Sequence, residues 1–249
     1  MRFDVITLFP ELFAAPLEHG VTRRAFGPEG ITVKLWPLRD HAEDAYRRVD
    51  DRPYGGGPGM VMLVEPLQRA LDAVRTERVD LPPVVHFTPT GRRLDQQLVR
   101  QIAAGSGAVL VCGRYEGIDQ RFVDRNVTLE ISLGDFVLSG GELPALVLLD
   151  AVARLQQGVL TAASHEQESF SDGLLEGPQY SRPECWITPE GERRVPDALL
   201  SGHHERIARW RRDQALALTL RRRPDLIGRA RAEGLLSAED ERYLASVKL

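Results

Sequence analysis

Residues 131–144 form a glycine-rich segment that contains no lysine or arginine. A nucleotide-binding P-loop places a lysine on the phosphates, and the dinucleotide fingerprint spaces its glycines as G-x-G-x-x-G between a strand and a helix. Gly134, Gly140 and Gly141 have the wrong spacing for either motif. The segment therefore predicts a ligand that carries no phosphate.

The same segment favours a flat, neutral or cationic ligand. Glycines allow the backbone to approach another group closely, and the carboxylates of Asp135 and Glu142 would tolerate a positive charge. S-adenosylmethionine combines adenosine, a sulfonium and an amino acid, so it is a ligand of the predicted kind.

An α/β fold is expected to position this segment, because strands and helices alternate through the first 160 residues. Short apolar or alternating runs predict parallel strands near residues 3–8, 31–36, 84–88, 109–112 and 127–131. Apolar residues at helical spacing predict helices near residues 64–75, 92–104 and 146–157. Such alternation is typical of a parallel sheet covered by helices.

Three loops follow the predicted strands, at residues 88–92, 113–119 and 131–144. Each alone could be an ordinary turn. Ligands of α/β proteins gather at the carboxyl ends of the strands, so together the loops predict one pocket. A further glycine-rich piece, residues 50–60, is interpreted as a lid or a substrate-facing loop.

Composition predicts a soluble globular protein of one or two domains. The chain has 249 residues, and no apolar run approaches the roughly 20 residues of a membrane span, so a cytoplasmic protein without a membrane partner is expected. Cys112 and Cys185 are too few for a disulfide framework or a cysteine-rich metal site and are expected to be reduced.

Charge is unevenly distributed along the chain. The net charge is −4, yet residues 201–231 carry nine arginines against three acidic residues. This excess could be a solvated helix face or a surface that contacts a nucleic-acid backbone.

The C-terminal part is predicted to be helical after a polar linker at residues 161–176. Ser201 or Gly202 could cap a helix that ends before Pro224. Ser237 and Asp240 have the spacing of a capping box for a last short helix.

Five motifs, in order along nearly the whole chain, closely resemble the bacterial tRNA (guanine-N1)-methyltransferase family of the TrmD type. They are Tyr54-Gly-Gly-Gly-Pro-Gly-Met, Gly113-Arg-Tyr-Glu-Gly-Ile-Asp, residues 132–142, residues 173–184, and Leu200-Ser-Gly-His-His-Glu with Trp210. The resemblance implies a SPOUT-type knotted domain at 1–160 whose C-terminal half forms a trefoil knot. It further implies a flexible linker at 161–176, a small all-α tRNA-binding domain at 177–249, and a homodimer with the active site at the subunit interface.

The resemblance also implies which residues hold S-adenosylmethionine. They come from the three loops and comprise Phe87, Pro89, Gly91, Gly113, Tyr115, Glu116, Gly117, Ser132, Leu133, Gly134, Asp135, Phe136, Val137, Leu138, Gly140, Gly141 and Pro144. Glu116 would help to place the methionine portion or the target guanine, although it could also be a solvated loop carboxylate.

Methyl transfer to guanine N1 requires a base, because N1 bears a proton, and a cation or hydrogen-bond donor at O6, where negative charge develops. The family position suggests Arg154 as the donor; alternatively Arg154 pairs with Asp150 within its helix, for about 0.2 to 0.5 kcal/mol. The base is expected to be Glu168, where the family carries an aspartate, and Asp172 is the alternative. By resemblance, the linker would deliver this base across the dimer interface when RNA binds.

By the same resemblance, Gly59, Tyr180, Arg182, Ser201 and His203 would contact RNA, although His203 could simply cap a helix. No metal-ligand set is visible in the sequence, and the resemblance leaves room for Mg²⁺ without a dedicated protein site. The predicted activity is methylation of N1 of guanosine 37 in tRNA, next to guanosine 36. The rivals are a knotted ribose 2′-O-methyltransferase and a non-catalytic RNA-binding protein.

Overall fold

The computed structural model describes residues 1–160 and 168–247. Contacts divide the chain into two compact units, Met1–Thr161 and Ala162–Leu249. Each unit has its own apolar core, and each is described by itself below.

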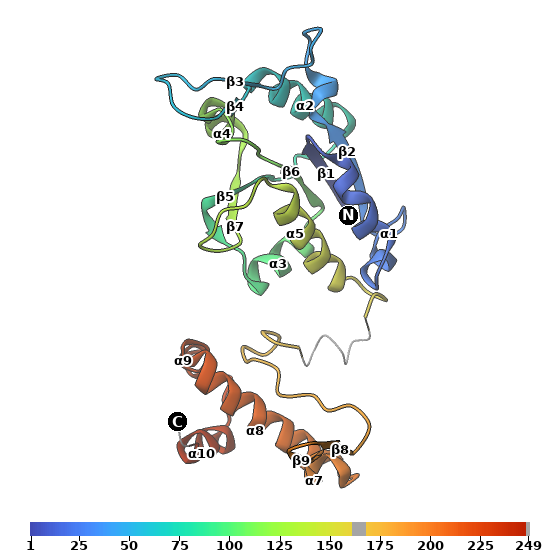
Figure 1. Cartoon of the computed structure of the whole chain (residues 1–249), viewed down its shortest axis with the longest axis vertical. Helices are drawn as coiled ribbons and strands as arrows, with labels where there is room; N and C mark the ends of the chain where they lie inside the picture. Colours follow the sequence, from blue (N-terminus) through green and yellow to red (C-terminus); the bar gives the residue numbers. More distant parts are fainter. Residues whose placement is uncertain (161–167, 248–249) are drawn as a thin grey trace. The chain divides into compact units, whose positions relative to one another are not determined.

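A five-stranded parallel sheet forms the centre of the first unit, in the order β2-β1-β6-β5-β7 (Figure 1). The strands are β1 (Arg2–Thr7), β2 (Thr32–Pro37), β5 (Val84–Arg93), β6 (Gly107–Val111) and β7 (Leu129–Ser132). β6 is buried along its whole length, as expected of a central strand with helices on both faces. The α/β prediction is confirmed.

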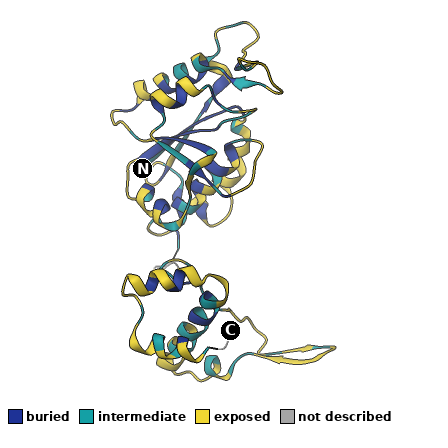
Figure 2. Ribbon diagram, turned by 90° about the vertical axis from the view of Figure 1, so that its left-hand side faces the viewer, coloured by how far each residue is buried: buried dark blue, intermediate teal, exposed yellow. Residues whose placement is uncertain are grey.

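Helices cover both faces of this sheet. α3 (Gln96–Ala103) and α5 (Glu142–Arg154) share one core with Phe3, Val85 and Leu110. α2 (Val64–Glu77) and α4 (Gln120–Asn126) share the other core with Ile6 and Val111. In Figure 2 the strands are largely buried, whereas the helices combine a buried and an exposed side.

Short elements complete the first unit. They are η1 (Pro10–Phe13), α1 (Ala14–Glu18), η2 (Thr22–Ala25) and η3 (Leu38–His41), together with β3 (Asp50–Asp51) and β4 (Val61–Met62). β3 and β4 pair antiparallel, so they close the glycine-rich segment between them into a loop with a fixed base.

The second unit is mainly helical. α8 (His204–Arg222), α9 (Pro224–Ala232) and α10 (Ala238–Ser246) pack around Leu216, Ile227 and Leu244, and α7 (Asp197–Leu200) precedes them. The unit also contains an antiparallel hairpin of β8 (Cys185–Thr188) and β9 (Gly191–Arg194). The expectation of an all-α unit is therefore wrong at this hairpin.

Several predicted boundaries differ from the structure. Residues 92–95 are not helical: β5 continues to Arg93, and α3 begins only after Asp95, whose side chain accepts a hydrogen bond from the Leu98 amide at 2.8 Å. The N-cap residue of α8 is His203, whereas the sequence suggested Ser201 or Gly202. The capping box of Ser237 and Asp240 is confirmed.

The predicted linker falls partly outside the described residues, at positions 161–167. Its remaining residues, 168–176, lie against α8, and Leu174 is buried in the core of the second unit. The described half of this linker therefore belongs to the second unit. The trefoil knot stays a prediction.

Candidate active site

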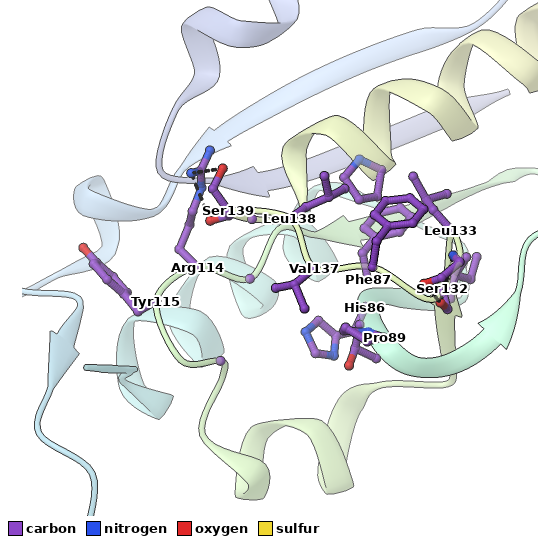
Figure 3. Close-up of a pocket in the computed structure, with 18 of the residues that line it drawn as sticks. His86, Phe87, Pro89, Arg114, Tyr115, Ser132, Leu133, Val137, Leu138 and Ser139 are labelled. Atoms are coloured by element: carbon purple, nitrogen blue, oxygen red, sulfur yellow. Dashed lines mark hydrogen bonds between the residues drawn. The ribbon is translucent and has the colours of Figure 1, made fainter. Parts of the chain in front are cut away.

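The three loops singled out in the sequence converge on one pocket of about 280 Å³ in the first unit (Figure 3). It lies where β5, β6 and β7 lead into their loops. Its lining consists of His86, Phe87, Thr88, Pro89, Gly113, Arg114, Tyr115, Glu116, Gly117, Ile131, Ser132, Leu133, Gly134, Phe136, Val137, Leu138, Ser139, Gly140 and Pro144. The volume is close to the lower end of the range for small-molecule sites.

The first of these loops differs from its expected form. Residues 88–91 do not follow a finished strand; they bulge out of β5, whose pairing with β7 is interrupted between Phe87 and Arg92 and then resumes. The bulge carries Thr88 and Pro89 to the pocket, as bulges beside functional sites commonly redirect side chains.

All of the predicted donor-binding residues line the pocket except Gly91, Asp135 and Gly141. Gly91 and Gly141 instead allow close packing behind the pocket. A Cβ on Gly91 would lie 2.5 Å from the Glu130 carbonyl carbon, and one on Gly141 would lie 2.7 Å from Cys112 Cα. Asp135 is exposed and outside the lining. Gly91 and Gly141 are therefore needed for packing next to the pocket and do not form its wall.

Gly141 joins the 131–144 loop to the end of β6. Its amide donates a hydrogen bond to the Gly113 carbonyl at 2.9 Å, and its backbone φ of −82° is ordinary. Glycine is therefore needed at this position for lack of space, not for an unusual backbone conformation.

A buried ion pair joins the 113–119 loop to the 131–144 loop. Glu142, the first residue of α5, is fully buried; it accepts hydrogen bonds from Thr7 Oγ1 at 2.9 Å and from Arg114 Nε at 2.8 Å. Arg114 also donates to the Ser139 carbonyl at 3.1 Å, and its guanidinium lies 4.5 Å from the Phe9 ring centre. The expectation that the Glu142 carboxylate would favour a positively charged ligand is wrong, because Glu142 is buried outside the pocket lining and its charge neutralises Arg114.

This pairing decides the electrostatics of the pocket. Among the described residues that line it, Arg114 is the only arginine or lysine. Because the buried Glu142 carboxylate already binds that arginine, the wall offers no uncommitted guanidinium or ammonium group for a phosphate. A neutral or cationic ligand fits this wall better than a nucleotide.

His86 is a pocket residue that the sequence analysis did not select. Its ring is mostly buried, with Nδ1 3.3 Å from Glu130 Oε1, and burial lowers the pKa of this imidazole, opposed by Glu130. Its Nε2 would lie 3.1 Å from a Cβ at Gly113. A polar residue within the otherwise apolar run of residues 84–87 is the signal that could have identified it.

The 113–117 loop contacts the glycine-rich segment at residues 54–60. The Glu116 amide donates to the Met60 carbonyl at 2.9 Å, and a Cβ on Gly59 would lie 2.2 Å from Glu116 Oε1. Tyr115 has a left-handed backbone, φ 60°, and a partly exposed ring. Burial, and next the Asp50 carboxylate, raise the pKa of the Tyr115 hydroxyl. Gly59, predicted to contact RNA, thus lies beside the pocket wall.

The two predicted catalytic residues belong to different units. Arg154 is the last residue of α5 and is half-buried. Glu168 belongs to the second unit, where it and Asp172 line a groove of about 490 Å³ beside α8.

The remaining predicted RNA-binding residues also lie in the second unit. Tyr180 packs against Trp210 with ring centres 6.1 Å apart, and Arg182 is exposed. Ser201 accepts a hydrogen bond from the His203 amide at 3.3 Å, and His203 occupies the N-cap position of α8. The side chains of Tyr180, Arg182 and His203 are exposed; Tyr180 contacts α8 through Trp210, and His203 lies at the start of α8.

The described residues contain no cluster of three or more histidine, cysteine or acidic side chains that could hold a metal ion. None of their helices is both long and apolar enough to span a bilayer.

Comparison with known proteins gives a consistent result. Residues 1–229 match the family described as tRNA (Guanine-1)-methyltransferase TrmD. The chain is 67% identical to the tRNA (guanine-N(1)-)-methyltransferase of Leptothrix cholodnii, with all of both chains covered. It is 64% identical to the protein of the same name from Methylibium petroleiphilum, with 99% of this chain and 98% of the relative covered. It is 54% identical to that from Bordetella pertussis, with the same coverage.

The match extends over the loops that form the pocket and over most of the second unit. On this evidence the chain belongs to the tRNA (guanine-1)-methyltransferase TrmD family.

Proposed function

We propose that this protein transfers a methyl group from S-adenosylmethionine to N1 of guanosine 37 in tRNA that carries guanosine 36, forming 1-methylguanosine and S-adenosylhomocysteine. Family membership supports tRNA guanine methylation. The observation that carries the proposal is the convergence of the three glycine-containing loops on one pocket without an uncommitted cation.

The pocket suits this methyl donor in shape and charge. Gly113, Gly134 and Gly140 bring backbone rather than side chains to the wall, so a planar adenine could lie against peptide groups. Phe87, Leu133 and Leu138 supply apolar surface. When bound, S-adenosylmethionine supplies an electrophilic methyl group on a sulfonium, and the role of this wall is to orient it.

The residues of the chain must then accept the proton of guanine N1 and stabilise the negative charge that develops on O6. The N1 lone pair attacks the methyl carbon as the carbon–sulfur bond breaks, and the N1 proton passes to a carboxylate. We assign that carboxylate to Glu168. Arg154 would donate a hydrogen bond to O6 as charge accumulates there.

Substrate RNA would be bound chiefly by the second unit. Arg206, Arg211, Arg221, Arg222 and Arg229 are exposed and form no ion pair among the described residues. In contrast, Arg209, Arg212, Arg223 and Arg231 all pair with carboxylates. The arginine-rich region thus separates into structural residues and residues available for phosphates.

From the family resemblance we further propose that the protein is a cytoplasmic homodimer. In this dimer the donor pocket of one subunit would act together with Glu168 of the other subunit. Mg²⁺ has no support in the described residues and is not part of the proposal.

Labelled S-adenosylmethionine and two tRNA transcripts that differ only in G37 or A37 test the proposal. The methyl group is mapped by nucleoside mass spectrometry. Label in 1-methylguanosine on the G37 transcript alone is the expected result. Label on a ribose hydroxyl would indicate a 2′-O-methyltransferase, and tRNA binding without label would indicate a non-catalytic binding protein.

A further inference from the structure

Residues 168–176, hereafter the docked loop, fold back on themselves and lie on α8. The Phe170 amide donates to the Leu174 carbonyl at 2.7 Å, and the Glu176 amide donates to Ser169 Oγ at 3.0 Å. The Leu175 amide donates to Thr219 Oγ1 on α8 at 2.9 Å. Because Glu168 begins this loop, whatever holds the loop also places Glu168.

One charged contact ties the outer turn of the docked loop to α8. Asp172 forms an ion pair with Arg212. The same guanidinium donates to Asp240 Oδ2 at 3.2 Å and to the Leu235 carbonyl at 3.3 Å. These contacts hold the Arg212 guanidinium through partners outside the docked loop, so its position does not depend on Asp172 alone.

Asp240 gives this arrangement a rigid base. Its side chain is only 5% exposed, and it completes the capping box of α10 with Ser237. It also accepts from Arg209 Nη1 at 2.9 Å. Burial raises the pKa of the Asp240 carboxyl, but the hydrogen bonds from Arg212, Ser237 and Arg209 together outweigh burial, so this pKa lies below its ordinary value and the anchor remains charged.

Glu168 and Asp172 line the same groove, and the contacts of Asp172 bear on which of the two is the base. Asp172 has one carboxylate oxygen on Arg212, and the other accepts from the Leu174 amide at 3.3 Å. Those contacts suit a tether rather than a group that must take a proton from a substrate.

We propose that Arg212 is a positioning residue: through Asp172 it holds the docked loop on α8 so that Glu168 is presented to the substrate, while Asp172 itself takes no proton. This inference rests on the proposed function, in which Glu168 is the general base. It removes Asp172 as the alternative base and gives Arg212 a role in the rate of methylation.

The expected magnitudes separate a tether from a base. The Asp172 side chain is 53% exposed and that of Arg212 is 25% exposed, and a solvent-exposed ion pair contributes little. Loss of the tether should therefore lower kcat about five-fold. Loss of a general base should lower kcat about 10²- to 10⁴-fold.

The test measures the methylation rate of the full chain at saturating tRNA and S-adenosylmethionine for E168Q, D172N, R212M and D172N/R212M. Asparagine keeps an oxygen for the Leu174 amide, so D172N removes the charge with little risk to the fold. D225N is the matched control, because the Arg223–Asp225 pair is similarly exposed, at 47% and 58%, and lies outside the docked loop.

We expect a large loss for E168Q and about a five-fold loss of kcat for D172N, with an unchanged KM for tRNA and an unchanged rate for D225N. R212M should resemble D172N, and the double variant should lose no more than either. In an E168Q background, D172N should leave the residual rate unchanged, an outcome that a general loss of structure would not produce.

Two kinds of result would overturn the positioning role while leaving the proposed reaction intact. A loss of 10²-fold or more for D172N would make Asp172 the base, and a wild-type kcat for D172N would remove the tether. Full activity of E168Q would overturn this inference together with the assignment of Glu168. Absence of methylation by the unchanged protein would refute the proposed function itself.

Discussion

Gly141→Ala is the smallest change that tests the assignment of the pocket. The new Cβ would lie 2.7 Å from Cys112 Cα and 3.0 Å from the Gly113 nitrogen. Both are backbone atoms, so no side chain can rotate away. To reach ordinary van der Waals contact near 3.4 Å, the two loops must separate by about 0.7 Å.

That separation lies directly behind the wall to which the donor is proposed to bind, and it lengthens the hydrogen bond from the Gly141 amide to the Gly113 carbonyl. Overpacking of this kind costs about 1 to 3 kcal/mol. If binding requires the original loop spacing, donor affinity should fall about 5- to 150-fold.

Isothermal titration with S-adenosylmethionine measures this effect directly. Gly228→Ala is the control, since Gly228 lies in α9 with no atom within 4 Å of an added Cβ. It should leave donor affinity unchanged and stabilise the helix by about 0.5 to 1 kcal/mol. A folded Gly141→Ala protein with wild-type donor affinity would refute the assignment of the pocket.

Three further predictions concern charge. Arg222→Ala should weaken tRNA binding and reduce the slope of log affinity against log salt by about 1. Arg223→Ala should have the smaller effect, because Asp225 already balances the charge of Arg223. Equal slopes for the two variants in filter-binding titrations would contradict the division of the arginines into paired and available residues. Glu142→Gln should lower the unfolding free energy by about 1.5 to 3 kcal/mol through loss of charged hydrogen bonds to a buried group, against less than about 1 kcal/mol for Glu77→Gln in an exposed pair; similar denaturation midpoints would refute the role of burial. Burial lowers the pKa of His86 below its ordinary 6.5, so on acidification the unfolded chain binds a proton at this imidazole before the folded chain does, and the unfolding free energy should fall as pH drops below about 6.5. His86→Gln should flatten this part of the plot of unfolding free energy against pH. An unchanged plot would show that other groups cause the fall.

The positions of the pocket loops could be predicted from the sequence because glycine restricts what the backbone can do locally. Gly113, Gly134 and Gly140 lie at the pocket wall. Runs of apolar residues likewise indicated the strands of the large sheet, most clearly β6, which is buried along its whole length.

The burial and pairing of charged residues could not be predicted in the same way. Glu142 looked available to a ligand, yet it is buried by contacts with Thr7, 135 positions away, and with Arg114. Such burial depends on tertiary packing between distant segments, and residue type alone does not determine it.

Boundaries failed where a local signal was outweighed. Apolar residues at helical spacing suggested a helix from residue 92, but pairing with β7 resumes after the bulge and keeps Arg92 and Arg93 extended. Asp95 was the usable signal, as it caps the helix that follows. The β8–β9 hairpin was likewise marked by Pro189, directly after β8, and by Gly191, the first residue of β9.

In the proposed mechanism, donor binding belongs to one unit, and proton transfer and most of the tRNA binding belong to the other, so each can be tested by a separate measurement. The proposed donor pocket is built entirely from residues of Met1–Thr161, whereas Glu168, its proposed tether and the arginines without an ion pair among the described residues of the second unit belong to Ala162–Leu249. A change at Gly141 should therefore act on donor affinity, one at Arg222 on tRNA affinity, and one at Asp172 on kcat alone. Because the three measurements are independent, a variant that altered the wrong one would show which assignment is at fault, even if the overall activity fell as expected.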